Sequence, residues 1–236
     1  ADVERDAARH PGELLAYAGV KEGDVVVDWI PGGGYFSRLF ATIVGPNGKV
    51  YAWVPKEIAG AHDIGANATA LAAERGNIET VIEPLNGPTR IANADIVWTS
   101  QNYHDLHTSF MAGADVAAFN KRVFDMLKPG GYFIVIDHVA NEGSGMEAPE
   151  KLHRIDPAIV KAESKYSIAL RFASAADERP GMSDGRLASF STASESYATA
   201  VFAITRAALK YANARRRFSA PALSSEVPPW RALIPA

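Results

Sequence analysis

The stretch from Val25 to Ser37, "VVVDWIPGGGYFS", places an aspartate, three consecutive glycines and an aromatic pair directly after an apolar run. The run predicts a buried strand, and helical spacing of apolar residues follows at Phe36, Leu39, Phe40, Ile43 and Val44. Glycines let a ligand approach bare main chain, and a helix N-terminus favours an anion. We expect a small-molecule site here, with Asp28 meeting a cationic or hydroxylated part of the ligand. The alternative is a tight turn that binds nothing.

The composition limits the classes of function. The 236 residues are 47% hydrophobic and 22% charged, which predicts a folded chain with a large core. A net charge of -3 argues against nucleic acid as a partner and favours a small molecule. The absence of cysteine excludes disulfides, thiolate metal ligands and cysteine nucleophiles. No apolar stretch has the roughly 20 residues that a membrane span needs, and the first residue, alanine, leaves cytoplasmic and exported locations both open.

Short apolar runs alternate with helical periodicities over the first part of the chain. The strands are expected at 25–29, 49–54, 77–84, 94–100 and 132–137, and the helices between and before them at 11–19, 36–44, 55–76 and 116–127. This alternation predicts a Rossmann-like α/β fold, a three-layer sandwich around a mainly parallel sheet, over residues 1–170.

The segments beyond the fifth strand carry weaker patterns. We expect a loop at 141–152, a short helix with Asp156 as N-cap and Pro157 at its first position, and a strand at 167–173. Residues 171–236 are predicted to form a divergent C-terminal extension. It would hold a loop or partly disordered stretch over 174–196, a helix over 196–217 and a proline-rich end.

The ordered set of motifs resembles the class I S-adenosylmethionine-dependent methyltransferases. The motifs are "VVVDWIPGGGYFS" and "MLKPGGYFIVIDH", and a closer resemblance, to a little-characterised bacterial group of predicted methyltransferases, adds "RDAARHPGELLAYAGVKEGD", "TSQNYHDLH" and "LHRIDPAIVKAE". The resemblance implies S-adenosylmethionine as cofactor and methyl transfer to a small molecule. It also implies that Asp28, Pro31, Gly32 and Gly34 face the methionine end of that cofactor.

Two positions depart from the family pattern. Ile30 stands where the family usually has the first glycine of the loop. The second strand ends in Val54 and Pro55 where the family has an acid for the ribose hydroxyls, so that Glu57 is the candidate for this role. These departures motivate an alternative function, a non-catalytic binding protein with a methyltransferase-like fold.

The loop "QNYHDLH", residues 101–107, follows the fourth strand at the same sheet edge as the glycines. His104 is the candidate base of methyl transfer because its ordinary pKa suits proton abstraction near neutrality. Asp105 or Asp137 is expected to orient it, and a direct His104–Asp105 pair requires the loop to turn. Tyr103 and Asn102 are candidates for lining the transfer site, and Gln101 for contacting the cofactor. A loop that only pins the sheet edge is the competing interpretation.

Histidines and aspartates at the strand ends leave a metal-dependent enzyme open as another alternative. The spacing contains no recognised metal motif, so no metal ligand is assigned from the sequence. The residues from which such a site would be drawn are His104, Asp105, His107, Asp137, His138, His153 and Asp156.

Overall fold

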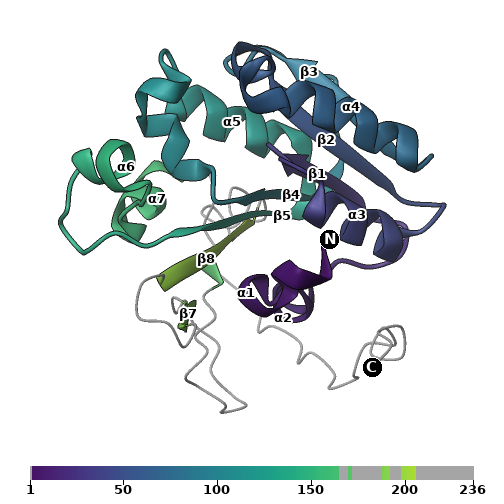
Figure 1. Ribbon diagram of the computed structural model, residues 1–236, viewed down its shortest axis with the longest axis horizontal. Helices are drawn as coiled ribbons and strands as arrows, with labels where there is room; N and C mark the ends of the chain where they lie inside the picture. The colour runs from purple at the N-terminus through teal and green to yellow at the C-terminus, as the bar shows by residue number, and fades with distance from the viewer. Residues whose placement is uncertain (1, 165–169, 172–187, 192–197, 206–236) are drawn as a thin grey trace, which may run out of the picture.

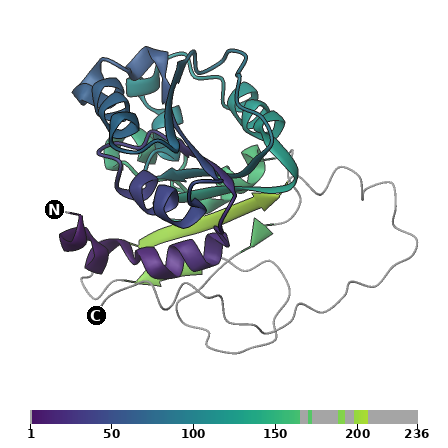
Figure 2. The same ribbon diagram turned by 90° about the vertical axis from the view of Figure 1, so that its right-hand side faces the viewer.

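The fold is built on one sheet with helices on both faces (Figures 1 and 2). The computed structural model describes residues 2–164, 170–171, 188–191 and 198–205. The strands are β1 (Val25–Trp29), β2 (Lys49–Pro55), β3 (Ile78–Glu83), β4 (Ala94–Ser100), β5 (Leu127–His138), β6 (Leu170–Arg171), β7 (Ala188–Ser191) and β8 (Ala198–Thr205). Their order is β3-β2-β1-β4-β5-β8-β6, with β7 also paired to β8. The first five strands are parallel, and β8 runs antiparallel to β5. This is the predicted Rossmann-like architecture.

The described α-helices are α1 (Asp6–Arg9), α2 (Pro11–Ala18), α3 (Tyr35–Val44), α4 (Ile64–Glu74), α5 (Val116–Met126), α6 (Glu147–Leu152) and α7 (Pro157–Glu163). Five of these described helices overlap predicted ones, whereas α1 and α6 were not predicted. Short 3₁₀ helices are η1 (Val3–Arg5), η2 (Lys56–Ile58), η3 (Ala61–Asp63), η4 (Tyr103–His107) and η5 (Ser109–Met111). Within the described ranges, no helix is both long enough and apolar enough to cross a bilayer.

Alternation along the central strands divides the core between the two faces of the sheet. On one face Trp98 packs against Phe36 and Phe40 of α3, with ring centroids 4.9 and 5.2 Å away. On the other face Trp29 lies 4.5 Å from Phe119 of α5, centroid to centroid. Figure 2 shows α3 and α4 on one side of the strands and α5 on the other. Asp28, the neighbour of Trp29 in β1, therefore faces α3.

Four predicted elements are wrong. The helix expected over 55–76 begins only at Ile64, because η2 and η3 come first. The loop expected over 141–152 contains α6, which starts at Glu147. Both errors follow from glycine-rich composition, which marks turns well but does not fix where helical hydrogen bonding resumes.

The helix expected over 196–217 is the third error. Residues 198–205 form β8, which pairs with β5 from Tyr132 to His138. The segment "ATAVFAIT" is rich in β-branched residues, and an open edge on β5 offers its main-chain groups to such a strand. The fourth error is the loop expected over 174–196, which contains β7. Of the strand expected over 167–173, residues 170–171 form β6. The remaining parts of these ranges and the proline-rich end lie outside the described residues.

Candidate functional site

The glycine loop lies between β1 and α3, at the carboxyl edge of the sheet. Its first hydrogen bond runs from Ile30 N to Trp53 O, 2.9 Å, and a second from Gly34 N to Pro31 O, 2.8 Å. Ile30 has a φ of 55°, in the left-handed region that a β-branched residue rarely adopts. The main chain therefore follows a glycine-like path at Ile30 even though the glycine is missing.

The glycines of this loop have different surroundings. A Cβ on Gly34, at φ +81°, would lie 2.7 Å from Leu71 Cδ1 of α4, so a larger residue at this position would force the buried Leu71 side chain to shift. A Cβ on Gly32 or Gly33 would meet no atom within 4 Å. Gly32 also has a positive φ, of 56°, whereas Gly33 does not. Gly32 and Gly33 thus present bare main chain to open space, as a close-lying ligand requires.

Alanine at Gly34 should destabilise the fold, whereas alanine at Gly33 should be nearly neutral. We expect Gly34→Ala to lower the free energy of unfolding by about 2–3 kcal/mol, because left-handed strain adds to the clash with Leu71. Urea denaturation of the two variants and the wild type measures the difference. Equal stability of the two variants would show that the α3–α4 contact tolerates a methyl group.

Asp28 is a buried carboxyl group at the end of β1. Its Oδ2 accepts a hydrogen bond of 2.5 Å from Ser37 Oγ of α3. Burial raises the pKa of Asp28 to about 7, against the opposing effects of the Ser37 hydrogen bond and the charge of Arg9. A carboxyl group in this state gains from any ligand that brings a cation or a hydroxyl donor to it.

Asn102 joins the ends of β1 and β4. Its Nδ2 donates to Ser100 O at 2.9 Å and to Ile30 O at 3.3 Å. The preceding residue, Gln101, has a φ of 65°, and its N–H donates to Ile136 O of β5 at 2.7 Å. Asn102 therefore lies beside the glycine loop, and Gln101 next to it is bonded to β5.

His104 is held by carboxylates on both sides of its ring. Its Nδ1 lies 2.8 Å from Asp137 Oδ1, and its Nε2 lies 3.4 Å from Asp105 Oδ1. Asp137 Oδ2 also accepts the His104 main-chain N–H at 2.8 Å. The chain turns as η4, which is what a direct His104–Asp105 pair requires. Both aspartates that the sequence offered as partners of His104 lie in contact with its ring, and Asp137 is the nearer.

The charges around His104 shift its pKa. Burial alone lowers the pKa of His104, but the hydrogen bond and charge of Asp137 and the charge of Asp105 outweigh it, so the pKa is raised. Burial also raises the pKa of Asp105, with His104 opposing. The arrangement favours a proton or another cation between the imidazole and Asp105.

Tyr103 and His107 point to α7 instead. The Tyr103 side chain is fully buried, and its hydroxyl donates to Glu163 Oε2 at 3.1 Å and accepts from Asn120 Nδ2 at 2.9 Å. His107 Nε2 lies 3.2 Å from the same Glu163 oxygen. Burial and the charge of Glu163 raise the pKa of Tyr103. These contacts fit a positioning role for Tyr103 better than contact with a ligand.

Glu57, the candidate for ribose binding, lies past the end of β2. Both of its carboxylate oxygens accept the Leu85 main-chain N–H, at 3.1 and 3.0 Å. Arg122 of α5 donates to Leu85 O at 3.0 Å and pairs with Glu83 at 2.5 Å. Glu57 is exposed, so its carboxylate oxygens can accept further hydrogen bonds. We call the contacts of the buried Arg122 side chain with Glu83 and the Leu85 carbonyl the Arg122 clamp. The sequence did not predict it, because Arg122 and Glu83 are 39 positions apart.

Of the seven candidate metal ligands, the structure brings three together. Ligand atoms of His104, Asp105 and His153 all lie within 4.8 Å of one another. Asp137 lies behind His104, and Asp156 caps α7 by accepting the Ala158 N–H at 2.8 Å, as predicted. His107 pairs with Glu163 and takes no part in the group.

Comparison with known proteins extends this description. No family model matches the sequence, and no curated protein matches it. Among solved structures, the chain is similar to an S-adenosylmethionine-dependent methyltransferase from Aquifex aeolicus, with a TM-score of 0.60 and 19% identity over 85% of this chain and 92% of that one. The chain has the fold of S-adenosylmethionine-dependent methyltransferases.

Two further structures with this methyltransferase fold are similar over most of the chain. One is a chain of the Haloferax volcanii complex between the Trm112 methyltransferase activator and a methyltransferase, with a TM-score of 0.55 and 17% identity over 87% of this chain and 93% of that one. The other is the YcgJ protein of Bacillus subtilis, with a TM-score of 0.53 and 19% identity over 70% of each chain. At these identities the likeness concerns the methyltransferase fold alone.

Proposed function

We propose that this protein is an S-adenosylmethionine-dependent methyltransferase that acts on a small molecule. The observation that carries the proposal is the edge of the sheet at β1: a buried Asp28 next to two glycines whose missing Cβ atoms leave open space. The methyltransferase fold of the chain and of its structural neighbours supports it.

The residues present suit the parts of this cofactor. Its carboxylate fits the main-chain N–H groups between Gly32 and the start of α3, and its amino group fits Asp28. Its ribose hydroxyls fit Glu57, while Asn102 lies beside the loop and Gln101 precedes it. Bound there, the cofactor would supply an electrophilic methyl group to an acceptor.

His104 is proposed as the base that takes the acceptor's proton. Asp137 accepts the Nδ1–H, which leaves Nε2 to receive a proton as the acceptor is methylated. Asp105, 3.4 Å from Nε2, stabilises the resulting imidazolium. Tyr103 fixes the turn through Glu163 and Asn120 and is proposed as a positioning residue.

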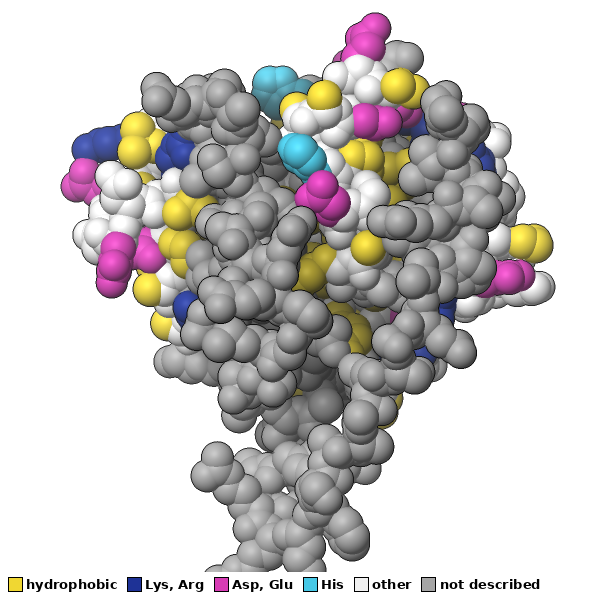
Figure 3. Space-filling model, turned by 90° about the horizontal axis from the view of Figure 1, so that it is seen from below, with side chains coloured by type: hydrophobic (Ala, Val, Ile, Leu, Met, Phe, Trp, Pro, Cys, Tyr) yellow, Lys and Arg dark blue, Asp and Glu magenta, His cyan; other side chains and the backbone are white. Residues whose placement is uncertain are grey.

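Small-molecule specificity remains part of the proposal. On the face shown in Figure 3, outside the grey atoms, lysine and arginine side chains are scattered and do not form one patch. A nucleic-acid substrate would favour a continuous basic surface.

Calorimetry with S-adenosylmethionine and with its demethylated product tests the cofactor claim. We expect binding tighter than about 1 mM, which corresponds to roughly 4 kcal/mol. Gly32→Ala should weaken this binding at least tenfold, because its Cβ would point into the space proposed for the ligand. Gly23→Ala is the control for backbone strain, since Gly23 also has a positive φ, of 82°, and open space around its Cβ position but lies outside the glycine loop. Wild-type binding weaker than about 1 mM contradicts the proposal.

A non-catalytic binding protein is the second candidate. The observation in its favour is that β2 ends in Val54 and Pro55 without an acid, and that the nearest acid, Glu57, already binds the Leu85 N–H. This candidate predicts that both cofactor forms bind too weakly to detect in the same calorimetric titrations.

A further inference from the structure

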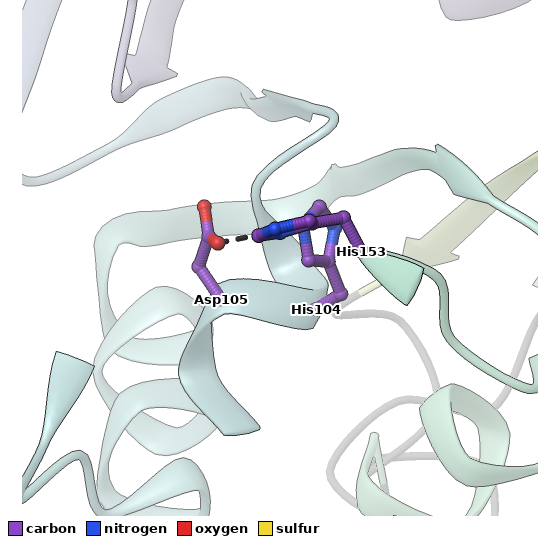
Figure 4. A group of neighbouring side chains, drawn as sticks. All are labelled: His104, Asp105 and His153. Carbon is purple, nitrogen blue, oxygen red and sulfur yellow. Dashed lines mark ion pairs between the residues drawn. The ribbon is translucent and has the colours of Figure 1, made fainter. Parts of the chain in front are cut away.

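The side chains of His104, Asp105 and His153 converge between η4 and the end of α6. His104 and Asp105 belong to η4, and His153 is the residue that ends α6. One ligand atom from each lies within 4.8 Å of the other two (Figure 4). His104 Nε2 and Asp105 Oδ1 are 3.4 Å apart, and the two imidazole rings are 5.5 Å apart between centroids at an interplanar angle of 76°. Figure 4 shows the three side chains pointing toward one another.

Hydrogen bonding by Asp137 decides which nitrogen of His104 faces this group. Asp137 Oδ1 lies 2.8 Å from Nδ1 and also accepts the His138 N–H at 2.7 Å, while Oδ2 accepts the His104 N–H. A carboxylate held by two main-chain N–H groups acts as an acceptor, so the ring proton sits on Nδ1. In the neutral ring the Nε2 lone pair then points at the Asp105 carboxylate.

Two acceptors that face each other need a cation between them. The carboxylate–histidine pair behind the ring is also the arrangement that orients metal-ligating histidines in proteins. Ligand atoms of a tetrahedral zinc site, each about 2.1 Å from the ion, lie roughly 3.4 Å from one another. The His104–Asp105 separation already has this value, and the distances from His153 to the other two, at most 4.8 Å, would have to shorten when an ion binds.

The site is open on one side. His104 is buried, Asp105 is half-buried and His153 is exposed. His153 has a left-handed backbone with φ of 49° and ends α6 by donating its N–H to Pro149 O at 3.1 Å. An ion can therefore enter from solvent and keep a water in its remaining position.

We propose that His104 Nε2, the Asp105 carboxylate and a ring nitrogen of His153 bind one divalent ion of the Zn²⁺ type. A set of two imidazoles and one carboxylate favours such an ion, whereas Mg²⁺ and Ca²⁺ prefer oxygen ligands alone. The site does not depend on cofactor binding. An ion on Nε2 would occupy the nitrogen proposed to receive the acceptor's proton, so metal binding and base function exclude each other.

The test uses the full chain, stripped of metal with a chelator and then titrated with Zn²⁺ by calorimetry and with Co²⁺ by visible absorption. We expect one ion per chain, with a dissociation constant tighter than about 10 μM, and the absorption bands of imidazole-bound Co²⁺. His153→Asn should weaken binding at least tenfold. This substitution keeps an exposed residue type that tolerates the left-handed backbone.

His62→Asn is the matched control. His62 is also exposed and has almost the same backbone conformation, φ of 48°, but it does not belong to the group. It should bind metal as the wild type does. The proposal is overturned if the wild type binds Zn²⁺ no tighter than about 1 mM, if His153→Asn binds as the wild type, or if His62→Asn weakens binding equally.

Discussion

Asp28→Asn should make the protein more stable than the wild type at pH 8, and the two should be almost equally stable at pH 4. The pKa of Asp28 is raised from 3.8 to about 7 in the folded state because the carboxyl group is buried. Between about pH 4 and pH 7 the folded chain therefore binds more protons at this site than the unfolded chain, and wild-type stability falls as the pH rises. Above about pH 7 the full loss, up to roughly 4 kcal/mol, is present.

Asparagine carries no charge, so the variant avoids this loss while its side-chain oxygen can still accept the Ser37 hydrogen bond. Urea denaturation at pH 4, 6 and 8 measures the difference. Ser37→Ala is the control: removing the donor should lower stability at pH 8 by about 1–3 kcal/mol. A variant that is less stable than the wild type at pH 8 would contradict the assignment of a buried, costly charge.

The same variant separates stability from function. If Asp28 binds the amino group of the cofactor, Asp28→Asn should weaken S-adenosylmethionine binding at least tenfold while the fold gains stability. Such an exchange is typical of residues kept for binding and not for folding. Unchanged binding in a stabilised variant would show that Asp28 does not contact the cofactor and acts only through its hydrogen bond with Ser37 of α3.

Arg122→Met should destabilise the fold by about 3–5 kcal/mol, the range for breaking a buried ion pair. The Arg122 guanidinium pairs with Glu83, donates to the carbonyls of Pro84 and Leu85, and lies 4.5 Å from the ring centroid of Trp53. Methionine fills much of the volume but leaves Glu83 and both carbonyls without their donor.

Arg90→Met provides the matched control because Arg90 also pairs with Glu83, at 3.8 Å, but from an exposed position. It should cost about 1 kcal/mol or less. Chemical denaturation of both variants at pH 7 gives the comparison. Similar losses would show that the Arg122 clamp at the end of β3 contributes no more than a surface pair.

Local patterns predicted the parallel part of the fold well. Each of its signals depends on neighbours within a few residues. They are the apolar run of β1, the apolar face of α3, and the proline and glycine at the two ends of α2. The turn that brings His104 to Asp105 was likewise foreseen as a requirement. Its partner Asp137 was one of two expected candidates, because parallel strands end at one edge.

Features that depend on distant residues were predicted less well. Nothing near Ala198 to Thr205 reveals the open edge of β5 that makes this segment a strand. His153 was one histidine among several until α6 placed it beside η4. Gly34 was assigned to the cofactor, whereas its contact with Leu71 gives it a packing role as well.

The pairing of β5 with β8 has a consequence for synthesis. His138 meets Thr199, so a growing chain must extend by roughly sixty further residues before this partner leaves the ribosome. Until then the edge of β5 is unpaired, and β-prone segments of other polypeptides can bind to it. Production in cells should therefore benefit from chaperones that shield nascent chains.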